Sequence, residues 1–256
     1  METLSALFFE LANVDRLEIL VELSNNPLKL TNISKTLKLT VQETSRHLQR
    51  LSEADLLTKV VDGTYQLTNY GENILFLLPA FEFLIAHRHY FKTHRISHIP
   101  RELLSRIGDL TGSKLLENPV QAFQHVNTII EEAKNHISFV ADQVPSGSIP
   151  LIEAAVKRGV IMQFLMPEDL GQPHIPDAYL PHYNSDDMNL LNLGRTKSID
   201  FVGTISERAA VVGFPTLDGR MDYAAFYTEN EIALRWCRDL FLHYWNQIES
   251  THPVDE

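Results

Sequence analysis

The sequence is poor in cysteine and contains no long apolar run. Its single cysteine, Cys237, excludes an internal disulfide framework, so hydrophobic cores must hold the fold together. No stretch reaches the roughly 18 apolar residues that a membrane-spanning helix needs, and residues 1–13 lack the basic start of a secretion signal. We therefore expect a cytoplasmic protein without a membrane partner.

The sequence also lacks the motifs of common catalytic and metal sites. It contains no G-x-S-x-G, no Walker A and no H-E-x-x-H motif. His87, His89, His94 and His98 lie close together in the chain, but they have neither a compact ligand spacing nor a cysteine or carboxylate pair beside them. We therefore expect no catalytic activity, no metal and no cofactor.

Charge is distributed unevenly along the chain. The whole sequence has 22 basic and 33 acidic residues, a net charge of −11. Residues 28–60 hold six basic and three acidic side chains, a net charge of +3. Phosphate binding needs local rather than global positive charge, so this segment suits DNA. Residues 215–256, with eight acids and three arginines, do not.

Residues 31–54 have the pattern of a helix-turn-helix. Thr31 is a good N-cap for a short first helix, and Thr40 is a good N-cap for a second helix that we expect to end at Ala54. The second helix has one apolar face with a threonine on it: Val41, Thr44, Leu48, Leu51 and Ala54. Such a stripe predicts an amphipathic helix packed on one side.

The opposite face of this second helix has the chemistry of a DNA-reading surface. It carries Gln42, Ser45, Arg46 and Gln49, with Arg50 at its side. Glutamine and arginine pair bidentately with adenine and guanine edges in the major groove, and serine reaches bases or phosphate. A helix of this type that closely follows a short helix predicts a recognition helix.

A two-stranded wing is expected after the recognition helix. Residues 56–61 and 64–67 are rich in β-forming side chains, and Asp62-Gly63 between them predicts a hairpin with a type I′ turn. Lys59 and Thr64 are placed where a wing contacts phosphate. Thr68 then caps a helix expected over residues 69–78, which Pro79 ends.

The next segment predicts a helical linker over residues 79–110. A helix is expected over residues 81–91, and Pro100 suits the first position of another helix that runs to Asp109. The linker is basic, which fits either solvated helix faces or a surface that flanks DNA or an anionic effector.

The C-terminal half predicts an α/β domain. Asn118-Pro119 opens a helix, and a strand at 136–141, a helix at 149–158 and a strand at 160–166 have the length of a β-α-β unit, which favours parallel pairing. The remaining expected elements are strands at 190–195, 198–202, 209–214 and 224–228 and a final helix at 229–248.

The N-terminal segment resembles winged helix-turn-helix proteins of the arsenic-repressor-like type. The motifs that carry the resemblance are V-D-R-L-E-I-L at 14–20, T-N-I-S-K-T-L at 31–37, T-S-R-H-L-Q-R-L at 44–51 and Y-Q-L-T-N-Y-G at 65–71. Metal-sensing members of that type carry clustered cysteines. This chain has only Cys237, so the resemblance does not imply metal sensing.

The C-terminal half resembles the sensor domain of archaeal regulators of the methanogenesis-regulator type, a domain similar to phospholipase-D-like folds. The motifs are I-P-R-E-L-L-S-R-I-G-D-L at 99–110, A-A-V-K-R-G-V at 154–160 and R-D-L-F-L-H-Y-W at 238–245. Phospholipase-D chemistry needs a histidine with a lysine two positions later. No histidine of this sequence meets that condition: His136, for example, is followed by Ile137-Ser138.

Candidate ligand contacts in this half are few. Arg195, near the end of an expected strand, is the best candidate for an anionic ligand, although single charges at strand ends are more often solvated. Tyr179, His182 and Tyr183 lie in a loop that could supply further groups, and Asp186-Asp187 fits a turn better than a metal clamp.

Together these patterns predict an α/β protein (α+β overall) with a winged helix-turn-helix domain at 1–78, a helical linker at 79–110 and an α/β sensor domain at 111–256. We expect a DNA-binding transcriptional regulator that binds double-stranded DNA as a homodimer. Its C-terminal domain would sense a small molecule or mediate dimerisation. One alternative is a protein–protein adaptor, which the Gln/Ser/Arg face disfavours, and another is a degenerate phosphodiesterase-like enzyme.

Overall fold

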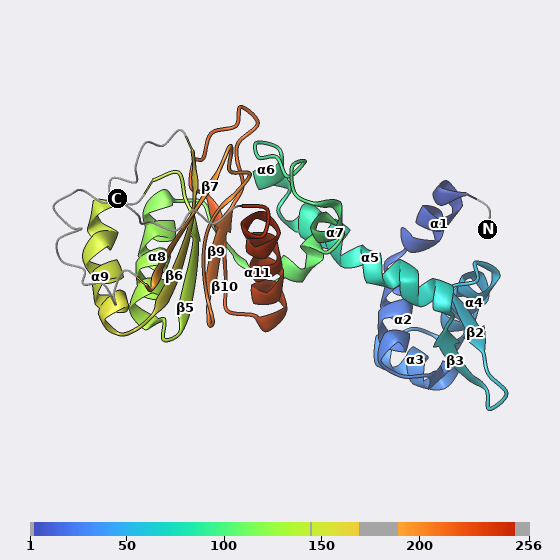
Figure 1. Cartoon of the computed structure of the whole chain (residues 1–256). Helices are drawn as coiled ribbons and strands as arrows, with labels where there is room; N and C mark the ends of the chain where they lie inside the picture. The colour runs from blue at the N-terminus through green and yellow to red at the C-terminus, as the bar shows by residue number, and fades with distance from the viewer. Residues whose placement is uncertain (1–2, 144, 169–188, 249–256) are drawn as a thin grey trace. The chain divides into compact units, whose positions relative to one another are not determined.

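The computed structural model describes residues 3–143, 145–168 and 189–248. It divides into two compact units, Met1–Pro79 and Ala80–Glu256, and the boundary falls inside one helix (Figure 1). Among the described residues, no helix has the length and apolar character needed to cross a membrane. The two units are described separately below.

The first unit consists of short helices and a small antiparallel sheet. Its helices are α1 (Leu4–Leu11), α2 (Val14–Asn25), α3 (Leu30–Leu37) and α4 (Val41–Glu53), and its strands are β1 (Leu28–Lys29), β2 (Leu57–Lys59) and β3 (Thr64–Leu67), in the sheet order β1-β3-β2. The core is formed by fully buried aliphatic side chains that include Ile19, Ile33, Leu48 and Leu51. The order of α2, α3, α4 and the β2–β3 hairpin is the predicted helix-turn-helix with a wing.

Helix α5 (Asn69–Ala86) starts where the wing ends. The Thr68 hydroxyl accepts a hydrogen bond from the Gly71 amide at 3.0 Å and donates one to the Asp55 carbonyl at 2.5 Å. A Cβ atom on Gly71 would lie 2.0 Å from the Leu56 carbonyl oxygen, so glycine is required at this position. Thr68 thus caps the helix as predicted.

Two local predictions for the first unit are wrong. Thr31 is not an N-cap, because α3 begins at Leu30 and Lys29 stands before it, already paired with Thr64 in the sheet. The wing turn is not type I′, because only Gly63 has a positive φ, +86°. Instead, residues 61–63 form a three-residue loop in which the Gly63 amide bonds the Val60 carbonyl, the arrangement of a type I turn with a glycine bulge.

The predictions for residues 79–110 also need correction. Pro79 does not end the helix: α5 continues through it to Ala86, with Leu78 packed on one core and Phe83 buried in another. The expected helix at 81–91 is divided between the end of α5 and α6 (Arg88–Phe91). Pro100 is the N-cap of α7 (Arg101–Leu104), which is followed by the 3₁₀ helix η1 (Ile107–Leu110).

The second unit is built on a seven-stranded mixed sheet with the order β4-β10-β9-β8-β5-β6-β7. The strands are β4 (Lys114–Leu116), β5 (His136–Val140), β6 (Ile161–Pro167), β7 (Leu191–Thr196), β8 (Val202–Ser206), β9 (Ala210–Gly213) and β10 (Ala225–Thr228). The pairs β5–β6 and β6–β7 are parallel, and all other neighbouring pairs are antiparallel. The predicted parallel pairing is therefore confirmed.

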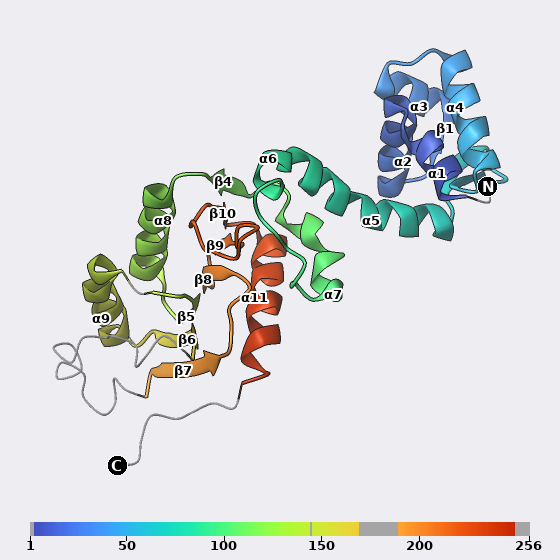
Figure 2. The ribbon, with the colours of Figure 1, turned by 90° about the horizontal axis from the view of Figure 1, so that it is seen from above.

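Helices cover both faces of this sheet (Figure 2). Helices α8 (Pro119–Glu132) and α9 (Ile149–Lys157), the latter preceded by the 3₁₀ turn η2 (Ser146–Ser148), lie on one face, and α11 (Glu231–Trp245) lies on the other. Successive side chains of a strand point to opposite faces of the sheet and so contribute to both cores. In β6, for example, Phe164 faces α8 and α9, whereas the next residue, Leu165, faces the α11 side. The result is a three-layer α/β/α domain.

Two strands differ from the sequence prediction. The expected strand at 198–202 is wrong, because β8 lies four residues later at Val202–Ser206. Strand β4 was not predicted; it is three residues long and pairs with β10 at the edge of the sheet. Residues 80–110, expected as a linker, contribute Tyr90, Ile99 and Ile107 to the core of the second unit.

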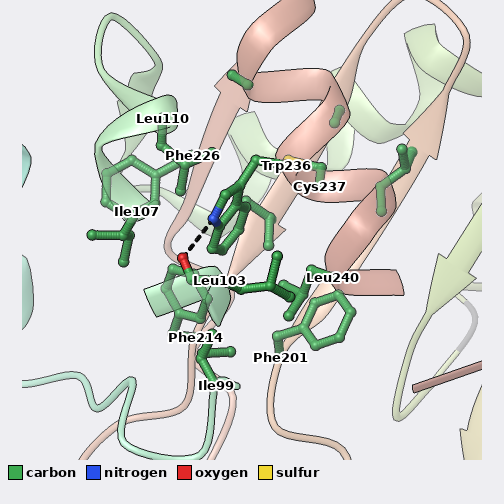
Figure 3. Packing of buried hydrophobic residues seen from close by; sticks show 14 of the residues in the cluster. Ile99, Leu103, Ile107, Leu110, Phe201, Phe214, Phe226, Trp236, Cys237 and Leu240 are labelled. Atoms are coloured by element: carbon green, nitrogen blue, oxygen red, sulfur yellow. Dashed lines mark hydrogen bonds between the residues drawn. The ribbon is translucent and has the colours of Figure 1, made fainter. Parts of the chain in front are cut away.

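Trp236 of α11 lies at the centre of the larger core (Figure 3). Its side chain is fully buried, and its indole N–H donates a hydrogen bond of 2.9 Å to the Leu103 carbonyl of α7. Aromatic and aliphatic side chains from α7, η1 and the sheet surround it, including Phe214, whose ring meets the indole edge to face. The final helix is thereby fixed to the segment before the sheet.

We predict that Trp236→Phe lowers the free energy of unfolding of the second unit by about 1–3 kcal/mol, because it removes a buried hydrogen bond and leaves a cavity in the core, although the Leu103 carbonyl keeps the Arg106 amide as a donor. The matched control is Trp245→Phe on the same helix, where the indole is half-buried and its N–H bonds no described residue. Urea denaturation followed by circular dichroism measures both. Equal losses in the two variants would contradict this role of the hydrogen bond.

Candidate nucleic-acid interface

The turn between α3 and α4 is built by a set of local hydrogen bonds. The Ser34 hydroxyl donates to the Leu39 carbonyl at 2.8 Å, and Lys38 adopts the left-handed conformation with φ +57°. Thr40 then caps α4: its hydroxyl accepts from the Glu43 amide, and the Glu43 carboxylate accepts from the Thr40 amide. This capping box fixes where α4 starts, and therefore which of its side chains point outward.

Helix α4 has one buried and one exposed face, largely as predicted. Thr44, Leu48 and Leu51 are buried in the core, and the following Ala54 is buried as well. The exposed face carries Gln42, Ser45, Arg46 and Gln49. Val41, expected on the apolar stripe, is instead 55% exposed at the start of the helix. The predicted reading face therefore lies at the surface.

Arg50, unlike Arg46 on the same helix, is paired with an acidic side chain within the protein. Its guanidinium donates to both carboxylate oxygens of Glu10 in α1, at 2.9 and 2.5 Å. The same guanidinium lies over the Phe9 ring, 5.3 Å from the ring centre. A bidentate pair of this kind orients an arginine strongly, so Arg50 attaches α4 to α1.

Glu10 joins two arginines. Besides Arg50, the buried Arg16 of α2 lies 3.3 Å from a Glu10 carboxylate oxygen and donates to the backbone carbonyls of Phe9 and Glu10. The Arg50 hydrogen bond, with the charges of both arginines, lowers the pKa of Glu10 below its ordinary value. Sequence reasoning missed this residue, since 40 positions separate the partners and no local pattern marks the pair.

The wing holds the two remaining predicted DNA contacts. The Lys59 ammonium lies 5.6 Å from the centre of the Tyr65 ring across the β2–β3 pair, and Lys59 is exposed. The Thr64 hydroxyl donates to the Asp62 carboxylate at 2.6 Å, and Thr64 is half-buried. The exposed Lys59 ammonium is therefore accessible to a phosphate, whereas the Thr64 hydroxyl is already hydrogen-bonded within the turn.

The candidate residues of the second unit are not brought into one site. Arg195, in the edge strand β7, donates to the Pro167 carbonyl at 3.2 Å, and it is half-buried. His94 is buried, stacks on Tyr90 and contacts the Asp222 carboxylate, while His87 lies against Phe83. The described part of the chain contains no group of three or more histidine, cysteine or acidic side chains arranged for a metal. Tyr179, His182, Tyr183, Asp186 and Asp187 lie outside the described residues.

Comparison with known proteins agrees with this architecture at the N-terminus. Residues 16–85 match the family model of the winged helix-turn-helix. The first unit is a winged helix-turn-helix domain. The match includes most of α2, all of α3 and α4, the wing and most of α5, and it confirms the winged helix-turn-helix that the sequence motifs indicated. No curated protein matches the chain.

Several solved structures are similar to the chain at low identity. TrmBL2, an archaeal chromatin protein that binds DNA, is 16% identical, with 93% of this chain and 94% of that chain covered and a TM-score of 0.45. Nuc, a phospholipase D family member from Salmonella typhimurium, is 17% identical over 51% of this chain and 90% of its own, with a TM-score of 0.37. NucT from Helicobacter pylori is 10% identical over 55% and 98%, with a TM-score of 0.41.

The Glu10–Arg50 pair yields a pH prediction. Because the pKa of Glu10 is lowered by folding, its contribution to stability is present above the ordinary value of 4.5 and is lost as the pH falls through the folded-state pKa. We predict that Glu10→Gln lowers the stability of the first unit by about 1 kcal/mol at pH 7, and that the difference from wild type shrinks as the pH falls below 4.5 and through the lowered pKa of Glu10. Thermal unfolding between pH 3 and pH 7 measures it.

Glu53→Gln is the matched control, because Glu53 is exposed and, among the described residues, its carboxylate accepts a hydrogen bond from the Gln49 amide alone, at 2.9 Å. It should change stability far less than Glu10→Gln does. A loss for Glu10→Gln that stays the same at every pH would show that charge on Glu10 does not stabilise the fold.

Proposed function

We propose that this protein is a DNA-binding transcriptional regulator. The observation that carries the proposal is the exposed face of α4, where Gln42, Arg46 and Gln49 project from a winged helix-turn-helix domain. In such domains the second helix of the motif enters the major groove and its exposed side chains contact base edges. The resemblance carried by the sequence motifs also implies a DNA-binding regulator.

The exposed side chains of α4 have different proposed roles in DNA recognition. Arg46 is exposed and makes no hydrogen bond or ion pair with a described residue, so its guanidinium is available for guanine. Gln42 is equally exposed and suits adenine. Gln49 donates to Glu53 in the free protein, and a base would have to replace that exposed contact. Arg50 positions α4 through Glu10, and its paired guanidinium does not contact a base.

Phosphate contacts come from the surface around α4. Lys59 in the wing and Lys29, Lys35 and Lys38 beside α3 are all exposed. Each such contact releases counterions from the duplex, so affinity should fall steeply with salt. The local charge of +3 over residues 28–60 favours phosphate binding by this surface, although the chain as a whole carries −11.

We further propose that the protein binds DNA as a homodimer. Half-sites on a duplex repeat about one helical turn apart, and two copies related by a two-fold axis read both. Exposed apolar side chains in the first unit support a protein partner: Leu4 is 67% exposed, Phe9 64% and Phe76 69%. These surfaces equally suit the alternative of a protein–protein adaptor, in which α4 would not contact DNA.

The second unit is proposed to act as a regulatory domain rather than as an enzyme. The chain has no histidine followed two positions later by a lysine, and no other nucleophile–base motif. A small molecule or a second copy that binds this unit would change the distance between two recognition helices, and thereby the affinity for DNA. A regulator of this kind would work in the cytoplasm, on the chromosome.

We predict that Arg46→Ala weakens binding to a duplex selected from a random pool by about 1–3 kcal/mol and relaxes the preference at one base pair. Lys59→Ala should weaken binding to all sequences alike and lower the salt slope by about 1. Fluorescence anisotropy at several salt concentrations measures both effects.

Arg101→Ala is the control, because Arg101 is exposed in the second unit, far along the chain from α4. It should leave affinity and base preference unchanged. If the wild-type protein selects no duplex and shows no salt-sensitive binding, the DNA-binding function is wrong and the adaptor is favoured.

A further inference from the structure

A small cavity lies in the second unit between α8 and the sheet. Its volume is about 70 Å³, and it opens at the carboxyl end of β5. Side chains from α8, α9 and five strands line it. We call it the α8 cavity.

The interior of the α8 cavity is apolar. Phe139 and Phe164 form part of its wall, stacked with ring centres 4.6 Å apart and both nearly buried. Val126, Ile130 and Ile152 supply aliphatic surface from the two helices above the sheet. An apolar interior of this kind binds hydrocarbon parts of a ligand by excluding water from them.

Polar groups gather at the mouth of the α8 cavity. The Tyr223 hydroxyl donates to a carboxylate oxygen of Asp142, Oδ1, at 2.7 Å and accepts from the Gln143 side-chain amide. Oδ2, the second oxygen of Asp142, has no hydrogen bond to a described residue. The mouth therefore offers an acceptor for which the described part of the chain supplies no donor.

Tyr223 is held in an unusual backbone conformation. Its φ is +62°, and only two other non-glycine residues among those described have a positive φ. A left-handed conformation costs a bulky residue free energy, and such residues gather where a side chain must be placed for binding. Its ring also contacts Phe123 on α8, with ring centres 5.2 Å apart. The strain thus places the hydroxyl beside Asp142.

Charge decides which ligands fit. Asp142 is the only charged side chain among the described residues that line the cavity. Burial and the Asp142 carboxylate raise the pKa of Tyr223, so the tyrosine stays a neutral donor. A carboxylate or phosphate would meet a negative charge with no cation to offset it, whereas an ammonium or hydroxyl group would donate to Asp142.

We propose that the α8 cavity binds a small compound with a short apolar body and one hydrogen-bond-donating group, an amine or an alcohol. This differs from the anionic ligand expected at Arg195, whose guanidinium already donates to a backbone carbonyl. The cavity is well below the roughly 300–1,000 Å³ of pockets for drug-sized ligands, so the body has only a few non-hydrogen atoms.

The inference rests on the proposed function in one respect: the ligand is an effector only if the protein is a regulator. Binding at the cavity does not depend on DNA. The site lies among elements of the second unit alone, formed by α8, α9 and the strands of one sheet. The test therefore measures ligand binding first and its effect on DNA second.

The test uses the full chain with labelled isoleucine and valine methyl groups and four compounds of similar size. Isobutylamine and isobutanol should shift the methyl resonances of Val126, Ile130 and Ile152 in a saturable manner. Isobutyrate should not, because its charge is repelled, and methyl tert-butyl ether, which cannot donate, should bind more weakly. Saturable shifts caused equally by isobutyrate would overturn the proposal, as would no saturable shift with the amine and the alcohol.

Two variants and a control locate the site. Asp142→Asn should weaken isobutylamine about tenfold and isobutanol less, because a charge-assisted hydrogen bond becomes a neutral one. Val126→Phe should fill the cavity and abolish binding of both, provided that circular dichroism shows a folded protein. Asp218→Asn, the same change at an exposed loop residue, should alter neither affinity. Unchanged amine affinity in Asp142→Asn would contradict the assignment of the acceptor.

DNA binding of the wild-type protein separates the two claims. Salt-sensitive DNA binding without any ligand-induced methyl shift would refute ligand binding in the α8 cavity and would still support a DNA-binding regulator. Methyl shifts at the cavity without DNA binding would support the ligand site and would refute the proposal that its ligand is an effector of DNA binding.

Discussion

The two-faced packing of α4 is the constraint on which the rest of the first unit depends. Thr44, Leu48 and Leu51 are buried, and this burial leaves Gln42 and Arg46 at the surface. The helix can turn little about its axis, because its start is fixed by the Thr40–Glu43 capping box and its last turn by the Arg50–Glu10 pair. A reading surface needs such rigidity, since base recognition depends on the placement of each donor and acceptor.

Arginine has two different roles on this one helix. Arg46 and Arg50 are one turn apart, and both are chemically able to contact DNA. The structure distinguishes them by what each one meets: Arg50 meets a carboxylate and an aromatic ring of α1, whereas Arg46 meets solvent. Helix α1 is thereby attached to α4, although it lies outside the helix-turn-helix motif itself.

The sequence predicted what depends on local pattern and missed what depends on distant partners. Helical spacing and N-cap chemistry located α4, and the Asp-Gly pair located the wing, because these signals lie within a few residues. The three-residue turn at 61–63 was missed because Asp62 uses its carboxylate to hold Thr64 instead of adopting a positive φ. Glu10 and Tyr223 could not be found this way, since Arg50 and Asp142 lie 40 and 81 positions away.

Proline was over-interpreted for a related reason. Pro79 is a signal against a helix interior, yet α5 runs through it, with apolar side chains packed before and after it. Core packing can outweigh the roughly 3 kcal/mol that a proline costs inside a helix. Residues 80–110 were likewise expected as a linker because their burial depends on strands that come more than a hundred residues later, such as β9 and β10.

The central claim is that α4 reads DNA through its exposed face. The most direct measurement is an NMR titration of the full chain with a duplex selected by the protein itself. We predict the largest shifts at the side-chain amides of Gln42 and Gln49 and at the Arg46 guanidinium, with smaller changes at Lys59. Shifts confined to the second unit, or none at α4, would contradict it.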